Sequence, residues 1–252
     1  MKLAIGIDIG GTGIKGALVD VKKGKLASER LRVETPDGGH PKDIVEAVRG
    51  LIAQLGKESD LPVGICFPAV VQHGVAKSAA NISKDWIGLD ADELFTRELG
   101  HPVHMLNDAD AAGYAEAKFG AAKGQKGLTI MTTLGTGIGS ALLFNGDLVP
   151  NSELGHLEIE GFDAEARAAF SAKERENLDW AQWAARLQTY YSRVEALFSP
   201  DLFIVGGGVS KEHEDFLPLL NLKTRIIPAE LKNAAGIIGA ATLARKESKK
   251  KS

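Results

Sequence analysis

Two glycine-rich segments of nearly identical sequence are candidates for anion binding. Residues 11–18 (GTGIKGAL) and 135–142 (GTGIGSAL) are identical at six of eight positions. Each follows one apolar run and leads into another, which predicts a strand, a tight turn and a second strand. Glycine turns admit positive φ, and their successive backbone N–H groups form a concave site for anions such as phosphate. One such segment is explained equally well by an ordinary hairpin, but the same sequence in both halves favours two phosphate-binding turns.

Asp108 is the candidate catalytic base. It follows the apolar run 103–107 and precedes the alanine-rich helical segment 109–119. Aspartate at a helix start is a common N-cap, so a purely structural role is an open alternative. A carboxylate at the carboxyl end of a strand is also where a base that accepts an alcohol proton would lie. Transfer of a phosphoryl group to an alcohol requires such a carboxylate, together with alignment and charge neutralisation.

Glu153 and His156 form a second polar pair, on a segment that follows the second glycine turn. A carboxylate accepts hydrogen bonds from two vicinal hydroxyls, and an imidazole donates or accepts one. A pair of this kind is more often ordinary surface decoration. It indicates a polyol site only in combination with the other motifs.

Alternating strand and helix patterns predict an α/β fold that positions these residues. The expected strands are 2–8, 15–21, 25–34, 63–67, 103–107, 128–134 and 202–205, and the expected helices are one from Pro41, then 91–99, 109–119, one around 183–198, and 235–245. The pair Asn145-Gly146 suits a tight hairpin turn. We expect two related lobes around a central cleft, residues 1–107 and 108–234, with the C-terminal helix 235–252 packing back on the first lobe.

Composition narrows the classes of function. The 252 residues are 44% hydrophobic with a formal net charge of −3, so the chain can bury a substantial core and has no basic field for nucleic acid. The lone cysteine, Cys66, is expected to be a reduced core residue, which excludes an intrachain disulfide and a multi-cysteine zinc site. We find no basic-then-apolar leader and no membrane-length apolar run, so a cytoplasmic protein is expected, with residues 245–252 as a solvated basic tail.

In combination, the motifs resemble the landmarks of the ROK family of sugar kinases, within the actin/hexokinase/Hsp70-like superfamily. In order, they are residues 8–12 (DIGGT), 107–112 (NDADAA), 135–139 (GTGIG) and 153–156 (ELGH). The match covers nearly the whole chain. It implies a two-lobed actin/hexokinase-like (ribonuclease H-like) α/β fold with a duplicated strand–Gly-rich turn–strand unit. In its short length and in segments 10–16, 148–159 and 199–211, the chain resembles the polyphosphate-using glucokinases of actinobacteria.

The resemblance also implies roles for individual residues. Asp108 would accept the proton of the sugar 6-hydroxyl, and Asp8 would position Mg²⁺ through water. The implied sugar-binding residues are Asn81, Asn107, Asp108, Glu153, His156 and Glu165. The implied donor-binding residues are Gly10, Gly11, Thr12, Gly13, Lys15, Gly135, Thr136, Gly137, Gly206, Gly207 and Gly208.

One departure from the family concerns the segment after His156. Many relatives carry a cysteine-rich zinc loop there, which ends in a glutamate that touches the sugar. The cysteines are missing here, so no zinc is expected, and Glu165 takes the place of that glutamate. Glu158 and Glu160 are competitors for this assignment, and a plain helix-start role for Glu165 is equally open.

The predicted function is transfer of a phosphoryl group from inorganic polyphosphate, and also ATP, to the 6-hydroxyl of glucose. The alternatives are a strictly ATP-dependent glucokinase or mannokinase, and a non-catalytic sugar-sensing protein. A family regulator with a DNA-binding segment is disfavoured because the chain opens directly on the first strand pattern. The candidate polyphosphate cations are Lys15, Lys84, Lys123, Lys126, Arg167, Lys173 and Arg175. A homodimer is expected from the family and from the aromatic-rich segment 183–198, with no nucleic acid or membrane partner.

Overall fold

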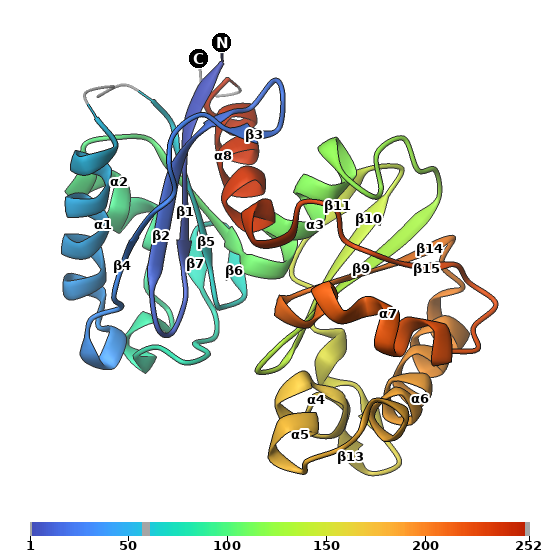
Figure 1. Cartoon of the computed structure of the whole chain (residues 1–252). Coiled ribbons are helices and arrows are strands. Elements are labelled where there is room, and N and C mark those ends of the chain that lie inside the picture. The colour runs from blue at the N-terminus through green and yellow to red at the C-terminus, as the bar shows by residue number, and fades with distance from the viewer. Residues whose placement is uncertain (1, 57–60, 250–252) are drawn as a thin grey trace. The chain divides into compact units, whose positions relative to one another are not determined.

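The computed structural model describes residues 2–56 and 61–249, and it contains two compact units (Figure 1). The first unit comprises the chain up to Ala115 together with the segment from Ala234 onward, and the second runs from Glu116 to Asn233. The division therefore falls inside a helix, α3 (Asp108–Phe119), whose first residue is Asp108. The last three residues of the basic tail, 250–252, lie outside the described residues.

The first unit is a mixed sheet covered by helices on both faces (Figure 1). Its strands are β1 (Leu3–Ile9), β2 (Ile14–Asp20), β3 (Lys25–Leu26), β4 (Leu31–Val33), β5 (Val63–Phe67) and β8 (Val103–Asn107), with a small separate hairpin β6 (Val71–Gln72) and β7 (Val75–Ala76). The sheet order is β3-β2-β1-β5-β8, β4 also pairs with β2, and β1, β5 and β8 are mutually parallel. Helices α1 (Pro41–Leu55) and α2 (Ala91–Leu99) pack on one face, and α8 (Ala235–Ser248) packs on the other.

The second unit repeats this plan. Its strands are β9 (Leu128–Leu134), β10 (Ile138–Phe144), β11 (Asp147–Val149), β14 (Leu202–Gly206) and β15 (Ile226–Pro228), in the order β11-β10-β9-β14-β15. As in the first unit, an antiparallel meander is extended by parallel strands. The remaining elements are the hairpin β12 (Glu158–Ile159) and β13 (Phe162–Asp163), and the helices α4 (Ala164–Ala168), α5 (Phe170–Arg175), α6 (Trp180–Phe198) and α7 (His213–Phe216).

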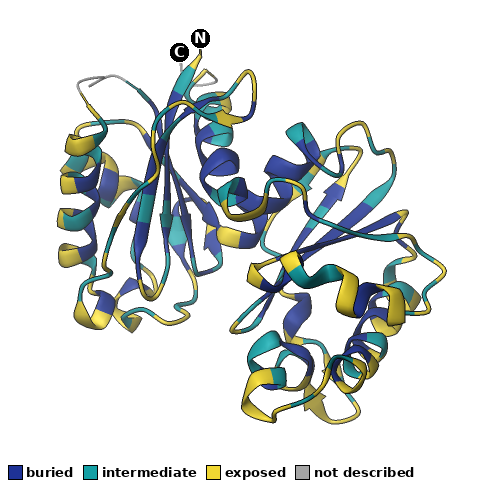
Figure 2. Ribbon diagram, viewed as in Figure 1, coloured by how far each residue is buried: buried dark blue, intermediate teal, exposed yellow. Residues whose placement is uncertain are grey.

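Each unit has its own hydrophobic core, visible as the dark central strands in Figure 2. In the second unit the core includes the α6 aromatics Trp183, Tyr190 and Tyr191, each at most 1% exposed. These rings are therefore not available to a dimer interface, and the homodimer stays a prediction. Leu197 on the same helix is 54% exposed. None of the described helices has the length and apolar character needed to cross a membrane.

The strand expected over residues 25–34 is wrong. The structure has two short strands there, β3 and β4, both paired with β2. Between them the Ser28 hydroxyl accepts the Leu18 backbone N–H at 3.0 Å and donates to the Glu29 carbonyl. The Leu18 N–H thus bonds to a side chain instead of a backbone carbonyl on this side of β2, because serine competes with the backbone ladder for hydrogen bonds.

Candidate active site

The two glycine turns close equivalent hairpins but differ in length. The β1–β2 register pairs Ile9 with Ile14, so the first turn is residues 10–13, and the β9–β10 register pairs Leu134 with Ile138, so the second is residues 135–137. Each turn is closed by one backbone hydrogen bond, Gly10 N–H to Gly13 O at 3.1 Å and Gly135 N–H to Gly137 O at 3.0 Å. The first turn therefore has one more residue, and one more N–H group, than the second.

Charged side chains accompany the first turn. Asp8 on β1 is the cross-strand partner of Lys15 on β2, and their side chains form an ion pair with Nζ 3.3 Å from Oδ2. The β9–β10 register places Thr133 opposite Gly139 at the corresponding point of the second hairpin, so that copy lacks the pair. The duplicated turns have thus diverged in their electrostatics.

Asn107 and Asp108 end β8 and begin α3. The Asn107 Oδ1 accepts the backbone N–H groups of Ala109 at 2.8 Å and Asp110 at 3.2 Å, so Asn107 caps the helix. Its Nδ2 donates to the Ala69 carbonyl at 3.2 Å, and its second N–H can still donate to a ligand. Asn107 is buried, whereas Asp108 is exposed. Since the neighbouring asparagine caps the helix, the Asp108 carboxylate is not required for that role.

Asp8 and Asp108 belong to the same edge of the first sheet, where the parallel strands β1, β5 and β8 end. Both negative charges act on the buried thiol of Cys66, which lies 3.6 Å from the Asp8 Oδ1. Burial is the main cause that raises the pKa of this thiol well above its ordinary value, and the two carboxylates raise it further. Carboxylate oxygens of this kind suit a hydrated divalent cation, which binds few protein groups directly and keeps several waters.

Asn81 and Gly11 line one cavity of the first unit. Its volume is about 370 Å³, and the other lining residues are Thr35, Pro36, Asp37, Gly38, Gly39 and Ile82. Asn81 has a positive φ of 57°, and a Cβ on Gly11 would lie 3.0 Å from the Asn81 Cβ. A predicted sugar-binding residue is thus placed directly against the first glycine turn.

In the second unit, Asp163 links His156 to the start of α4. The His156 Nδ1 lies 2.8 Å from one Asp163 oxygen, and the other oxygen accepts the N–H groups of Glu165 and Ala166 as the helix cap. Glu165 in turn accepts the Ile138 backbone N–H at 2.9 Å, and its other oxygen lies 4.0 Å from the His156 Nδ1. The structure thus favours Glu165 over Glu158 and Glu160 as the carboxylate beside His156.

His156, Asp163 and Glu165 each offer one atom that could coordinate a metal ion, and these three atoms lie within 4.8 Å of one another. The short His156–Asp163 separation is that of a hydrogen bond. That hydrogen bond is the main cause that raises the pKa of His156, with the charges of Glu165, Asp163 and Glu153 adding to it and burial opposing it. Burial raises the pKa of Glu153, the His156 charge lowers it, and the Glu165 charge raises it.

The segment that carries Glu153 and His156 is anchored on β10. The buried Ser140 hydroxyl donates to the Ser152 carbonyl at 2.8 Å and accepts the Leu154 N–H at 2.9 Å. Gly155 is required between the two functional residues, because a Cβ there would lie 2.1 Å from the Ile138 carbonyl oxygen. The ELGH motif is therefore held against the end of the second glycine turn.

The triple glycine lies beside the same turn. Gly206 ends β14 opposite Thr133, and a Cβ on Gly207, which has φ of 86°, would lie 2.2 Å from the Leu134 carbonyl oxygen. Nothing lies within 4 Å of a Cβ built on Gly208. Ser171 also contacts the turn, since its backbone N–H donates to the Gly135 carbonyl and its hydroxyl donates to that of Thr136.

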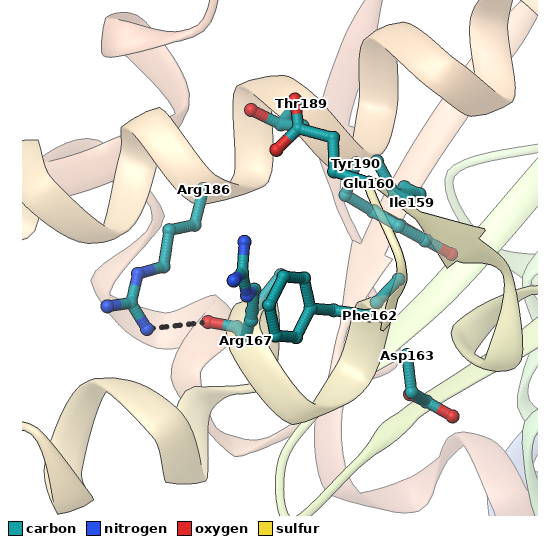
Figure 3. A pocket seen from close by; sticks show the side chains of 10 residues that line it. Ile159, Glu160, Phe162, Asp163, Arg167, Arg186, Thr189 and Tyr190 are labelled. Carbon is teal, nitrogen blue, oxygen red and sulfur yellow. Dashed lines mark hydrogen bonds between the residues drawn. The ribbon is translucent and has the colours of Figure 1, made fainter.

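A small cavity of about 80 Å³ lies among β12, β13, α4 and α6 (Figure 3). The Arg167 guanidinium lies over the Phe162 ring, 3.2 Å from its centroid, and Arg186 donates to the Arg167 carbonyl. Asp163 also borders this cavity. These contacts support the hairpin that presents Asp163 to His156.

Sequence reasoning missed two charged residues that contact the predicted site. Asp163 stands seven residues after His156, and its N-cap position before α4 was the available signal. Arg32 on β4 donates from Nη2 to the Thr12 carbonyl at 3.0 Å. No local pattern marks Arg32, because the contact depends on β4 pairing with β2.

Comparison with known proteins identifies the family. The sequence model of the ROK family matches residues 4–173. The chain belongs to the ROK family. It is 45% identical over 237 residues to the polyphosphate glucokinase of Mycobacterium tuberculosis (strain CDC 1551 / Oshkosh), a match that covers 94% of this chain and 89% of that protein.

Solved structures of ROK kinases have the same fold. The inorganic polyphosphate/ATP-glucomannokinase of Arthrobacter sp. strain KM is 54% identical with a TM-score of 0.93, covering 98% of this chain and 100% of that one. A ROK family glucokinase from Streptomyces griseus, in complex with glucose and AMPPNP, is 26% identical with a TM-score of 0.83, covering 97% and 99%. The expected actin/hexokinase-like α/β fold is confirmed.

Proposed function

We propose that this ROK protein is a polyphosphate-dependent glucokinase, which transfers a phosphoryl group from inorganic polyphosphate to the 6-hydroxyl of glucose. The observation that carries the proposal is the 54% identity over 98% of the chain to a kinase that uses polyphosphate, supported by 45% identity to a polyphosphate glucokinase. Relatives of this kind act on a phosphate polymer and a hexose, so the reaction yields glucose 6-phosphate and a polymer shortened by one phosphate.

Asp108 is the general base in this proposal. Its carboxylate is exposed at the start of α3, while Asn107 holds the helix end and fixes the backbone that carries it. As the 6-hydroxyl oxygen attacks the terminal phosphorus, the carboxylate accepts the hydroxyl proton. Asn81, Asn107, Glu153, His156 and Glu165 would bind the other hydroxyls, which fixes the orientation of the attacking oxygen.

The donor would bind to the glycine turns. Backbone N–H groups of residues 10–13 and 135–137, with the Gly206–Gly208 segment and Lys15, supply hydrogen bonds and positive charge to phosphate oxygens. Kinases of this type generally use a divalent metal, for which we expect Mg²⁺ near Asp8. Such an ion neutralises charge on the phosphates. A homodimer is part of the proposal on family grounds alone.

ATP and mannose are the second donor and acceptor in this proposal. The Arthrobacter relative is named for both donors and for both glucose and mannose, and the Streptomyces griseus relative binds AMPPNP. The triple glycine that begins at the last residue of β14 is intact, as expected for a nucleotide-using relative.

A coupled assay of sugar 6-phosphate formation tests the function. Polyphosphate and ATP are compared at matched phosphate concentration, each with glucose and with mannose. We expect turnover with polyphosphate and glucose. Turnover with ATP alone would replace the proposed donor, and glucose binding without turnover from either donor would indicate a sugar-binding protein instead of an enzyme.

A further inference from the structure

The last glycine of each turn, Gly13 or Gly137, lies against a charged side chain, and the two charges have opposite sign. Gly13 and Gly137 occupy equivalent places in the repeated sequence. A Cβ on Gly13 would lie 2.8 Å from the Arg32 Nε, whereas a Cβ on Gly137 would lie 2.4 Å from a Glu165 carboxylate oxygen. One turn is therefore covered by a guanidinium and the other by a carboxylate.

Arg32 is fixed on the first turn by two contacts. Its Nη2 donates to the Thr12 carbonyl at 3.0 Å, and its guanidinium atoms Nε, Nη2 and Cζ all lie within 3.0 Å of the place where a Gly13 Cβ would be. The strand registers align Asp8, Lys15 and Arg32 across β1, β2 and β4, so the three lie in one row on the sheet. The absence of a side chain at Gly13 is what allows the arginine to approach the backbone so closely.

Over residues 2–56 and 61–249, Arg32 forms no ion pair with a carboxylate. Lys15 is paired with Asp8. Among the residues that the structure describes, no carboxylate lies within 4.0 Å of the Arg32 side-chain nitrogens. A guanidinium has five N–H donors, so the bond to Thr12 leaves others for phosphate oxygens, with the planar geometry that suits them.

Three other candidate cations in the second unit are engaged elsewhere. Arg167 lies over the Phe162 ring, the Lys173 Nζ lies 4.3 Å from the centre of the Trp180 ring, and Arg175 pairs with Glu176 and donates to the Ala166 carbonyl. These side chains stabilise α4, α5 and the neighbouring hairpin. Arg32 is instead an exposed cation held directly on a glycine turn.

We propose that Arg32 is a donor-binding residue, which holds phosphate groups of the polyphosphate chain at the first glycine turn. The inference rests on the proposed function for its choice of ligand. Glu165 makes the place at Gly137 negative, which favours hydroxyl groups over phosphate at that one residue, so a donor phosphate would contact the second turn away from Gly137. The two copies of the turn thus differ at their last glycine: the first would bind the anionic donor there, and the second would bind the sugar.

Direct binding of inorganic polyphosphate tests the proposal without requiring turnover. Isothermal titration at fixed Mg²⁺ and saturating glucose compares the wild type with Arg32→Ala, Arg32→Lys and Arg97→Ala. Arg97 is the matched control, an exposed arginine on α2 of the same unit whose Nε lies 3.2 Å from a Glu98 carboxylate oxygen. We expect Arg32→Ala to weaken polyphosphate binding about tenfold or more, as for loss of a charge-assisted hydrogen bond. Arg32→Lys should recover part of this loss, and Arg97→Ala should bind like the wild type.

The salt dependence gives a second readout. A residue that neutralises one phosphate contributes about one unit to the slope of log affinity against log salt concentration, so Arg32→Ala should lower that slope by about one. A folding defect would not change the slope in this way. Thermal melting of each variant confirms that it is folded.

Gly13→Ala provides an independent variant. Gly13 has no positive φ, so alanine is conformationally permitted, and the added methyl displaces the Arg32 side chain. We expect a similar loss of polyphosphate binding, with little further loss when the two substitutions are combined, because both remove one interaction.

Unchanged polyphosphate affinity and salt slope in folded Arg32→Ala would overturn the inference, as would absence of polyphosphate binding by the wild type. Equal losses in Arg32→Ala and Arg97→Ala would also overturn it, since they indicate a general charge effect. Polyphosphate binding that depends on Arg32 without any sugar phosphorylation would support the role of Arg32 and contradict the proposed function.

Discussion

Asn107 and Asp108 are adjacent in sequence but have different environments. Asn107 is buried and its amide satisfies the first N–H groups of α3, whereas Asp108 is exposed. A helix start usually needs one capping side chain. Because Asn107 provides it, capping does not depend on the Asp108 carboxylate, although its Oδ1 also accepts the Ala109 N–H at 2.8 Å.

Asp108→Asn should lower kcat by about 10²–10⁴-fold while glucose binding is largely retained, because the amide cannot accept the hydroxyl proton. Steady-state kinetics and glucose titration measure the two effects. Asp179→Asn is the control, since Asp179 caps α6 with the same kind of side-chain hydrogen bond. Turnover that survives in Asp108→Asn would exclude this residue from the mechanism.

The His156–Asp163 pair makes stability depend on pH. The native pKa of His156 is raised above its ordinary value of 6.5, mainly by the hydrogen bond to Asp163. The pair therefore stabilises the protein fully below pH 6.5, and this contribution is lost as the pH rises through the native pKa. More than half of the ring is exposed, so solvent screening keeps the effect below about 1 kcal/mol.

Asp163→Asn should remove this dependence, because asparagine can still cap α4 but carries no charge for the imidazolium. Denaturant unfolding of wild type and variant at about pH 5.5 and about pH 8.5 measures the difference. The wild type should exceed the variant in unfolding free energy by more at the lower pH. An equal difference at both values would show that the pair does not titrate as stated.

At the scale of elements, three glycines allow α8 to lie close to its neighbours, two of them at the first sheet and one at α3 (Figure 1). A Cβ added to Gly6 would lie 2.1 Å from the carbonyl oxygen of Ile237, and one added to Gly64 would lie 2.0 Å from the carbonyl oxygen of Ala240. A Cβ added to Gly239 would lie 1.8 Å from the carbonyl oxygen of Ala111. All three partner atoms belong to backbone, which cannot move aside as a flexible side chain would. The C-terminal helix is thus held on β1, β5 and α3 by close backbone contact.

Gly64→Ala should destabilise the protein by about 1–3 kcal/mol or more, because the methyl overpacks a rigid contact between β5 and α8. Gly50→Ala is the matched control. Nothing lies within 4 Å of a Cβ at this position inside α1, so alanine should stabilise the helix by about 0.5–1 kcal/mol. Chemical denaturation measures both, and destabilisation of equal size in both variants would contradict the packing argument.

At the scale of the whole molecule, the proposed reaction would draw on different groups from each of the duplicated units. The first carries Asp8, Asp108 and Arg32, and the second carries His156 and Glu165. If glucose binds to groups of both units, it should slow backbone hydrogen exchange in both, around residues 81 and 107–110 and around 153–165. Exchange with and without glucose, with sorbitol as the control polyol, tests this. Protection confined to one unit would contradict the proposed division of sugar-binding residues.

Much of the architecture was predictable because its determinants are local. The helix over Ala91–Leu99 and the strand over Val103–Asn107 have the bounds expected from apolar spacing and end signals. The repeated glycine turns and the Asn145-Gly146 hairpin were likewise found where short-range backbone requirements place them. The small hairpin that carries Asp163 and the break between β3 and β4 were not, because each depends on side-chain hydrogen bonds that leave no periodic signal.

By itself, the sequence determined the family, the duplicated turns and the identity of the candidate base, since each is encoded in a short run of residues. Only the tertiary structure decided that Arg32 covers Gly13, that Glu165 covers Gly137 and that Asp163 orients His156. These contacts join residues that are distant along the chain or separated by a turn. Strand pairing and helix docking create them, and no local pattern of residue types specifies which charges will meet.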